Sequence, residues 1–212
     1  MARGKFITLE GGEGTGKSTQ VPLLAEALRA AGLQVHTKRE PGGSPGAEAI
    51  RKLLVTGEPG RWDATSEALL HFAARRDHVR SVIEPKLAAG TWVLSDRFAD
   101  STLAYQGYAQ GLGREAVRAL YDLTLGDFAP DLTLILDLPV EQGLARAAAR
   151  RDGEDRYERF GPDFHAKLRE AFHDIARREP ARCALIDAAG DPDGVQAALR
   201  AVVAGRLGVA FP

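Results

Sequence analysis

The chain has 212 residues, of which 44% are hydrophobic, enough for one sizeable α/β domain and short for two. Its 28 basic and 29 acidic residues leave a formal net charge of −1, which argues against the broad cationic surface of a nucleic-acid-binding protein. One cysteine excludes an internal disulfide, and the sequence shows neither a bilayer-spanning run nor a leader pattern, so we expect a cytoplasmic protein without a membrane partner.

Short β-rich runs alternate with longer helical patterns along the chain, which is typical of parallel strands joined by crossover helices. Helices are expected over Lys17–Ala31, after a glycine-rich loop, and over Ala64–Ala89. The predicted strands are residues 5–10, 34–40, 91–96, 131–138 and 183–188. We therefore predict a single domain over residues 1–212, in which a five-stranded parallel sheet has helices on both faces as an α/β/α sandwich.

The loop after the first strand carries the strongest motif in the sequence. Residues 11–18, GGEGTGKS, fit the phosphate-loop pattern G-x-x-x-x-G-K-[ST], with a predicted strand before it and a helix after it. Lys17 is expected to meet the β- and γ-phosphates of ATP, and Ser18 to hold Mg²⁺. The expected ATP-binding residues are Gly11, Gly12, Glu13, Gly14, Thr15, Gly16, Lys17, Ser18 and Thr19.

A nucleoside triphosphate site is compatible with a small-molecule kinase, a GTP-driven switch or an ATPase that works on a macromolecule. The sequence has no N-K-x-D tetrapeptide of the kind that reads guanine, which argues against the switch. The balanced charge argues against an extended macromolecular surface. A kinase needs a second anion site beside the first, and the sequence offers candidates for it.

Polar residues at the ends of the second and third predicted strands fit that second site. Arg39 and Arg97 follow strands whose carboxyl ends meet at one edge of a parallel sheet, and an arginine fork suits a phosphate. An isolated arginine at a strand end is more often in a surface ion pair, so the argument rests on the two together. Asp96 is a candidate Mg²⁺ ligand, and alternatively a helix N-cap.

A dense run of arginines occupies residues 146–160, with Gly153 between two helical patterns. Its simpler interpretation is a solvated charged connection. We favour a lid over about residues 150–160, which would bring Arg150, Arg151 or Arg156 to the transferring phosphoryl group.

Five segments together resemble the bacterial thymidylate kinases: LEGGEGTGKSTQ, TKREPGGSPGAE, EALLHFAARRDHV, WVLSDRFADSTLAYQGYAQGLG and FAPDLTLILDLPVEQGLARAAAR. The resemblance covers nearly the whole chain and implies a phosphate-loop kinase that transfers the γ-phosphoryl group of ATP to dTMP, with Mg²⁺, as a homodimer. Two alternatives are a kinase for another small nucleotide acceptor and a regulatory protein that binds nucleotide without transfer.

The resemblance also implies roles for the acceptor-site residues. Arg97 would hold the acceptor phosphate, with Arg39 nearby. The helix that carries HFAARR would stack an aromatic ring on the base and send Arg75 to O4; between His71 and Phe72 we favour Phe72, which alternatively is a core residue. The remaining contacts implied are Thr102 to the base, Tyr105 against the sugar 2′ position and Gln106 beside them.

Glu13 places a carboxylate inside a loop that binds phosphates. In the family that the chain resembles, an acidic residue at this position approaches the 3′-hydroxyl of the acceptor nucleotide. The resemblance therefore implies that Glu13 contacts the second substrate. A water-mediated role near Mg²⁺ and simple exposure at the loop tip are the alternatives. Because the loop itself has no arginine, we expect the catalytic cation to come from Arg150–Arg156.

Overall fold

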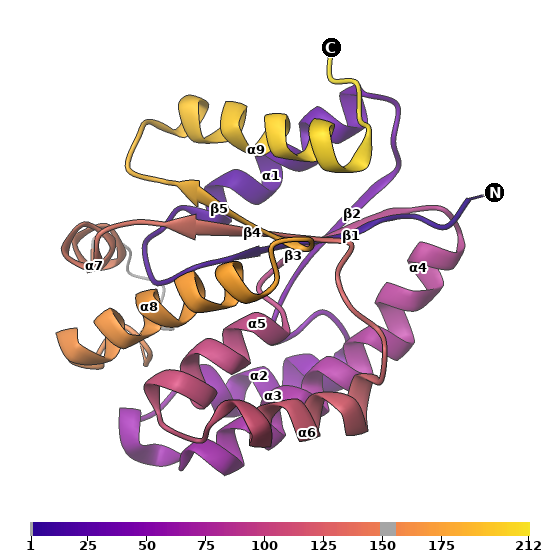
Figure 1. Cartoon of the computed structure of the whole chain (residues 1–212). Helices are drawn as coiled ribbons and strands as arrows, with labels where there is room; N and C mark the ends of the chain where they lie inside the picture. The colour runs from indigo at the N-terminus through magenta and orange to yellow at the C-terminus, as the bar shows by residue number, and fades with distance from the viewer. Residues whose placement is uncertain (1, 149–155) are drawn as a thin grey trace.

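The computed structural model describes residues 2–148 and 156–212, and over these residues it has the expected α/β architecture (Figure 1). Five strands in the described residues form one sheet, in the order β2-β3-β1-β4-β5, with every neighbouring pair parallel. The strands are β1 (Phe6–Glu10), β2 (Val35–Arg39), β3 (Trp92–Asp96), β4 (Leu132–Asp137) and β5 (Cys183–Asp187). The predicted parallel sheet is confirmed.

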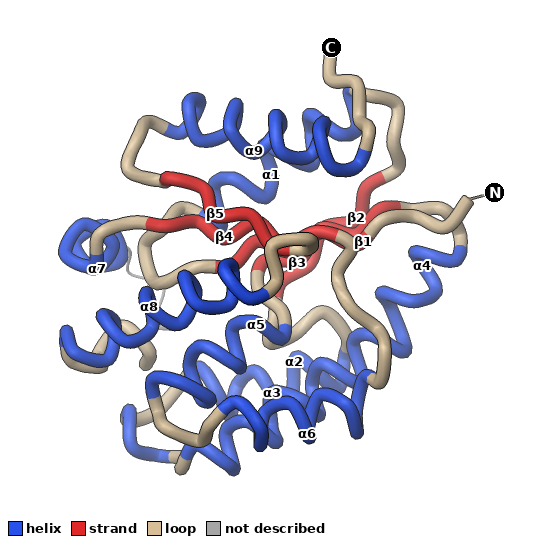
Figure 2. Tube along the Cα trace, in the orientation of Figure 1, coloured by secondary structure: helices blue, strands red, loops and turns tan. Residues whose placement is uncertain are grey.

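Helices cover both faces of this sheet (Figures 1 and 2). α1 and α9 lie together on one face, and α2 to α6 and α8 lie on the other. The helices are α1 (Lys17–Ala30), α2 (Pro45–Val55), α3 (Ala64–His78), α4 (Glu84–Ala88), α5 (Ala99–Thr102), α6 (Arg114–Leu125), α7 (Val140–Ala148), α8 (Pro162–Arg178) and α9 (Pro192–Leu207). The fold class inferred from the sequence is therefore confirmed.

The long helix expected over Ala64–Ala89 is present as three consecutive helical segments. α3 continues through a π-helical stretch, η2 (Val79–Ile83), directly into α4, which ends at Ala88. A second π-helical stretch, η3 (Leu103–Ala109), extends α5. Capping explains where α3 begins, because the Asp63 carboxylate accepts hydrogen bonds from the two backbone N–H groups at Thr65 and Ser66.

Burial on both faces explains the composition of the central strands. β1, FITLE, is buried at all five positions, as expected for an inner parallel strand covered on both sides. Apolar side chains from α1 and α9, including Leu24 and Leu199, pack with Ile7 and Leu134 on one face. A second cluster, which includes Phe6, Phe72 and Phe98, lies on the other face.

The sheet order also decides which loops meet. Because β2, β3 and β1 are neighbours, the segments that follow their carboxyl ends lie side by side, and Asp96 is in register with both Leu9 and Arg39. This edge of the sheet collects the phosphate loop and the acceptor-site candidates. In residues 2–148 and 156–212, no helix has the length and apolar character needed to cross a membrane.

Candidate active site

The phosphate loop connects β1 to the N-terminus of α1, and its glycines are required by close contacts. Gly14 has φ 67°, and a Cβ atom added there would lie 1.9 Å from the carbonyl oxygen of Gly143 in α7. Gly16, which precedes α1, has a left-handed φ of 95°. The sequence therefore lets the backbone make a tight turn whose N–H groups precede a helix N-terminus, the arrangement that binds phosphates.

Lys17 lies inside this loop. Its ammonium donates to the carbonyl oxygens of Gly11 and Gly12, at 3.0 and 2.7 Å, and to Thr15 Oγ1 at 3.2 Å. Burial, with repulsion from Arg97, lowers the Lys17 pKa to about 8. The lysine is thus held where a triphosphate in the loop would meet it.

Arg97 joins the phosphate loop to the segment after β3. Its guanidinium donates to the Gly11 carbonyl oxygen at 3.0 Å, to Ser101 Oγ at 3.1 Å and to Glu13 Oε1 at 2.9 Å. Arg97 has φ 70°, the positive-φ region that L-residues seldom adopt. That backbone turns the side chain back over the loop instead of along the strand direction.

A buried carboxylate braces the strained segment. Glu10 Oε1 accepts from the backbone N–H of Phe98 at 2.7 Å, and Oε2 accepts from Ser101 Oγ at 2.5 Å. Burial, together with repulsion from Asp100, raises the Glu10 pKa to about 7. Glu10 thereby ties the end of β1 to both sides of the turn that presents Arg97.

Glu13 points toward the acceptor side of the site. Its Oε1 accepts from Arg97 and, at 2.5 Å, from the hydroxyl of Tyr105. Burial alone would raise the Glu13 pKa, but the charges of Arg97 and Lys17 outweigh it and bring the pKa to about 2. The carboxylate is therefore ionised at neutral pH and neutralised locally by cations.

One cavity connects the loop to the acceptor-site candidates. Its lining includes the last residues of the phosphate loop as well as side chains from the β2, β3, α3 and α5 regions. The expected site residues in this lining are Glu13, Gly14, Thr15, Gly16, Lys17, Ser18, Asp96, Arg97, Thr102, Tyr105 and Gln106. Residues of this lining that sequence reasoning missed are Glu40, Pro41, Arg51, Val55, Ser101, Tyr157 and Glu158.

Arg75 lies directly behind this cavity, almost fully buried. It donates to Glu40 Oε2 at 2.7 Å, to Thr102 Oγ1 at 3.1 Å and to the carbonyl oxygen of Phe98 at 3.0 Å. Glu40 also contacts His78 Nδ1 at 3.0 Å. The proposed base-reading arginine is thus brought next to Thr102, and a buried carboxylate neutralises its charge.

The structure does not bring Arg39 to the cavity, contrary to expectation. Its side chain is about half exposed, with Nη2 3.5 Å from Glu48 Oε2. Strand geometry gives the reason, because successive side chains point to opposite sides and the next residue, Glu40, faces the cavity. The arginine that lines this part of the cavity is Arg51 of α2, which donates to the Pro41 carbonyl oxygen at 2.7 Å.

Phe72 is a core residue, so the choice of Phe72 over His71 for the base stack is corrected. Phe72 is 1% exposed, and its ring lies 6.4 Å from that of Tyr121 in the apolar cluster below the sheet. His71 lines the cavity instead. Helix periodicity explains the difference, because His71 and Arg75 are four residues apart and share one face, whereas Phe72 is one step around the helix.

The proposed lid cations divide into two groups. Arg150 and Arg151 lie outside the described residues. Arg156 is fully buried and donates to Glu67 and to backbone carbonyl oxygens at the end of α2 and in the α2–α3 connection, so it does not face the cavity. Its predicted contact with the transferring group is therefore corrected to a structural ion pair.

Another cavity adjoins the phosphate loop, and its lining does not include Arg97. Residues of the loop and of α1 line it together with Arg146 of α7 and the segment between β5 and α9. Arg146 Nη1 donates to the Ala188 carbonyl oxygen at 3.2 Å. These lining residues were not predicted from the sequence. The signal in the sequence that could have indicated them is that the β5–α9 connection also follows the carboxyl end of a strand.

Comparisons with known proteins agree with this geometry. A family model described as thymidylate kinase matches residues 9–199. The chain is 56% identical over 209 residues to a thymidylate kinase of Caulobacter vibrioides, covering 99% of this chain and 100% of that protein. It is 58% identical over 197 residues to a thymidylate kinase of Rhodopseudomonas palustris strain TIE-1, covering 91% and 85% respectively.

A solved structure gives the same result. The crystal structure of thymidylate kinase from Ehrlichia chaffeensis superposes with a TM-score of 0.78 at 35% sequence identity. The match covers 95% of this chain and 99% of that one, so the similarity extends through both the phosphate-loop side and the acceptor side of the cavity.

Proposed function

The chain belongs to the thymidylate kinase family, and from this premise we propose how its residues phosphorylate dTMP to dTDP with ATP. It is a thymidylate kinase, because the family model matches most of the chain and relatives described as thymidylate kinases are 54–56% identical to it over nearly its whole length. The observation that carries the assignment of roles is that one cavity is lined by both the phosphate loop and the Arg97–Tyr105 region. A donor phosphate and an acceptor phosphate can therefore meet within it.

ATP would bind with its triphosphate in the loop of residues 11–19. Backbone N–H groups at the start of α1 would hold the phosphates, and Lys17 would leave its loop acceptors to neutralise the β- and γ-phosphates. The cavity beside Arg146 and Asp191 supports a place for the nucleoside part of ATP. The planar guanidinium of Arg146 suits a stack on the adenine ring.

Mg²⁺ would be held by Ser18 and Asp96 together with the phosphates of ATP. Both side chains line the cavity next to Lys17. Their oxygens fit the ion, because Mg²⁺ prefers oxygen ligands and takes one or two from the protein when the substrate supplies the others. When bound, the ion neutralises charge on the triphosphate.

The acceptor nucleotide would lie between Arg97 and α3. Arg97 would hold its phosphate in a part of the cavity that Arg51 also lines. Glu13 would accept a hydrogen bond from its 3′-hydroxyl. Tyr105, fixed by its hydrogen bond to Glu13, would crowd the sugar 2′ position. His71, Thr102 and Gln106 line the part of the cavity where the base would lie, and Arg75, which donates to Thr102 from behind the lining, would reach O4.

Transfer needs alignment and charge neutralisation more than a strong base. The acceptor phosphate oxygen is already charged, so Arg97 and Lys17 would bring the nucleophile and the γ-phosphorus together while the cavity excludes water. We keep Arg150 as the proposed lid cation, within a lid of about residues 150–160. The burial of Arg156 removes it from this role.

We further propose one domain over residues 1–212 that forms a homodimer in the cytoplasm, where ATP and nucleoside monophosphates are present. Exposed leucines on neighbouring helices support the dimer: Leu53 of α2, Leu69 of α3 and Leu123 of α6, the last of them 82% exposed. Small nucleotides are the expected ligands, with neither nucleic acid nor membrane as a partner.

A coupled assay of ADP production tests the function directly. Purified protein with ATP and Mg²⁺ is expected to form ADP only when dTMP is added, and a panel of dUMP, dCMP and dAMP is expected to give lower kcat/KM values. Equal activity with several acceptors would contradict the substrate assignment. ADP formation without any acceptor would contradict the transfer reaction.

A further inference from the structure

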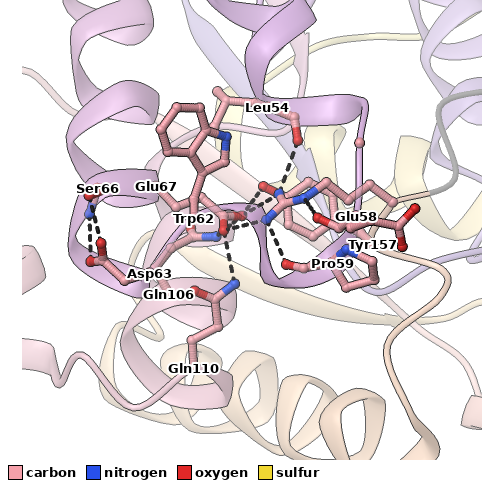
Figure 3. Close-up of polar contacts among 12 residues, drawn as sticks. Leu54, Glu58, Pro59, Trp62, Asp63, Ser66, Glu67, Gln106, Gln110 and Tyr157 are labelled. Carbon is pink, nitrogen blue, oxygen red and sulfur yellow. Dashed lines mark hydrogen bonds and ion pairs between the residues drawn. The ribbon is translucent and has the colours of Figure 1, made fainter.

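A fully buried carboxylate lies immediately behind the acceptor side of the cavity. Glu67, in the first turns of α3, is 0% exposed and accepts hydrogen bonds from three side chains at Oε1 and two at Oε2 (Figure 3). The donors to Oε1 are Gln106 Nε2 at 3.2 Å, Arg156 Nη1 at 3.1 Å and the Tyr157 hydroxyl. The donors to Oε2 are Arg156 Nη2 at 3.0 Å and Gln110 Nε2 at 3.2 Å.

Arg156 forms an ion pair with this carboxylate and holds both of its oxygens in place. The guanidinium has five N–H groups, and each has an acceptor, two of them on Glu67. The other three acceptors are the carbonyl oxygens of Leu54, Glu58 and Pro59. A carboxylate paired with an arginine only accepts hydrogen bonds, so every polar group that faces Glu67 must donate.

This requirement fixes the Gln106 amide. Because Glu67 cannot donate, Gln106 must present its NH₂ group to Glu67, which turns its carbonyl oxygen the other way. That oxygen, Oε1, is buried and has no hydrogen-bond partner among the described residues, although Gln106 itself lines the cavity. Buried acceptors are seldom left unpaired, which points to a donor supplied by a ligand.

The same requirement fixes a second pair of side chains. Tyr157 gives its hydroxyl proton to Glu67, so its oxygen accepts from His71 Nε2, 3.0 Å away. Burial and nearby Arg75 hold the His71 pKa well below its ordinary value, so the ring is neutral and its single proton lies on Nε2. Glu67 thus determines the hydrogen-bonding direction of three cavity-lining side chains: Gln106, Tyr157 and His71.

Gln106 and Arg75 together match one type of base edge. Thr102, which accepts from Arg75, is four residues before Gln106 on the same helical run, so the two side chains share a face. Arg75 has only donors, and the outward carbonyl oxygen of Gln106 is an acceptor. Thymine pairs with this arrangement through its O4 acceptor and neighbouring N3–H donor, whereas cytosine presents a donor and an acceptor in the opposite order.

We propose that Glu67 is a positioning residue that sets the base specificity of the enzyme, because it holds the Gln106 carbonyl oxygen toward the N3–H group of the acceptor base. The proposal deepens, and rests on, the proposed dTMP kinase function. Glu67 touches neither substrate; it acts by imposing the direction of the Gln106 amide. With an amide at position 67, Gln106 can turn over and present its NH₂ group, which suits cytosine.

The experiment compares kcat/KM for dTMP with kcat/KM for dCMP in the wild type and in Glu67→Gln. Both values come from one preparation, so the ratio does not depend on the fraction of folded enzyme. We expect the dTMP:dCMP ratio to fall about tenfold or more, because a site built to accept a substrate N–H loses its selectivity. An unchanged ratio would overturn the proposal.

Gln110→Leu is the matched control. It removes another donor to the same carboxylate, but Gln110 is not part of the cavity lining, so the ratio should stay at the wild-type value. A fall in Gln110→Leu equal to that in Glu67→Gln would show that general disturbance around Glu67 is the cause, and would also overturn the proposal.

A second variant covers loss of folding, because Glu67→Gln weakens a buried ion pair. Glu67→Asp keeps a negative charge for Arg156, but its side chain is one methylene shorter, which moves the acceptor away from Gln106. It should lower the dTMP:dCMP ratio by a smaller factor than Glu67→Gln. An unchanged ratio in Glu67→Asp would also overturn the proposal. Failure of the proposed function is distinguishable, because then the wild type itself would not prefer dTMP. A wild type that prefers dTMP, with variants that keep the same preference, rejects the role of Glu67 alone.

Discussion

Arg97 Nη2 donates to Glu13 Oε1 at 2.9 Å, so the cation at the end of β3 neutralises the carboxylate of the phosphate loop. The two residues are far apart in the chain, yet neither suits its surroundings without the other. Arg97 is held near Gly11 and needs an anion, and an unpaired Glu13 would repel a phosphate bound in the loop. Both residues line the cavity, where we propose that the pair separates the ATP side from the acceptor side.

Arg97→Ala is expected to impair transfer while ATP binding survives. In the proposed site the acceptor phosphate would lose its fork of donors, so kcat should fall about 10²–10³-fold, the usual cost of removing one donor to developing charge. The measurements are the coupled assay and a calorimetric titration with ATP. Arg118→Ala, an exposed arginine paired with Asp122, is the control and should behave as wild type. Equal loss of ATP binding and turnover would point to misfolding and contradict the role.

Glu13→Gln should change the acid stability of the protein. The Glu13 pKa is about 2 in the folded protein, against 4.5 for an unperturbed glutamate such as one in the unfolded chain. The stabilising contribution of Glu13 is therefore present above about pH 4.5 and is lost as pH falls toward 2. The shift corresponds to about 3 kcal/mol. Free energies of unfolding from urea titrations at pH 6 and pH 3 should differ less in the variant. Parallel curves for the two proteins would contradict this.

Arg156→Met should act on stability before it acts on catalysis. Removing the guanidinium leaves Glu67 buried without its charge partner, which costs about 3–5 kcal/mol. Arg159→Met, at a more exposed position three residues on, is the control and should stay within about 0.5 kcal/mol of wild type. Urea unfolding measures both. Unchanged stability with a large loss of kcat would restore Arg156 as the lid cation.

His71→Gln and Phe72→Ala should separate base binding from core packing. His71→Gln keeps a donor for Tyr157 but removes the ring, so KM for dTMP should rise about tenfold, within the usual worth of a base stack. Phe72→Ala should destabilise the protein by about 3–5 kcal/mol with a smaller effect on KM. Steady-state kinetics and thermal unfolding of both variants test this. The opposite pattern would return the stack to Phe72.

Leu123→Glu should weaken the proposed homodimer. Leu123 is 82% exposed on α6, and a charge there would have to be buried between subunits. Light scattering coupled to size-exclusion chromatography should give a dimer mass for the wild type and a larger monomer fraction for the variant. Leu185→Glu, at an exposed leucine on the edge strand β5, is the control. A monomeric wild type would reject the dimer.

Local patterns in the sequence were enough for the architecture. Alternating apolar runs and helical spacing determined the five parallel strands and their covering helices, because hydrophobic periodicity reflects local backbone geometry. The phosphate loop and its Lys17 could also be predicted from the sequence. The glycines at fixed spacing are needed for the tight strand–helix turn, and this need depends only on residues close together in the chain.

Side-chain direction was decided only by the tertiary structure. The sequence could not show that Arg39 points away from the cavity while Arg51 borders it, or that Phe72 packs in the core beside a cavity-lining His71. The arginine-rich sequence predicted that Arg156 is a lid cation, because its partner, Glu67, is 89 residues away in the chain and the pairing depends on the fold. Such contacts join distant segments, and the burial that makes an ion pair or fixes an amide exists only after those segments pack together.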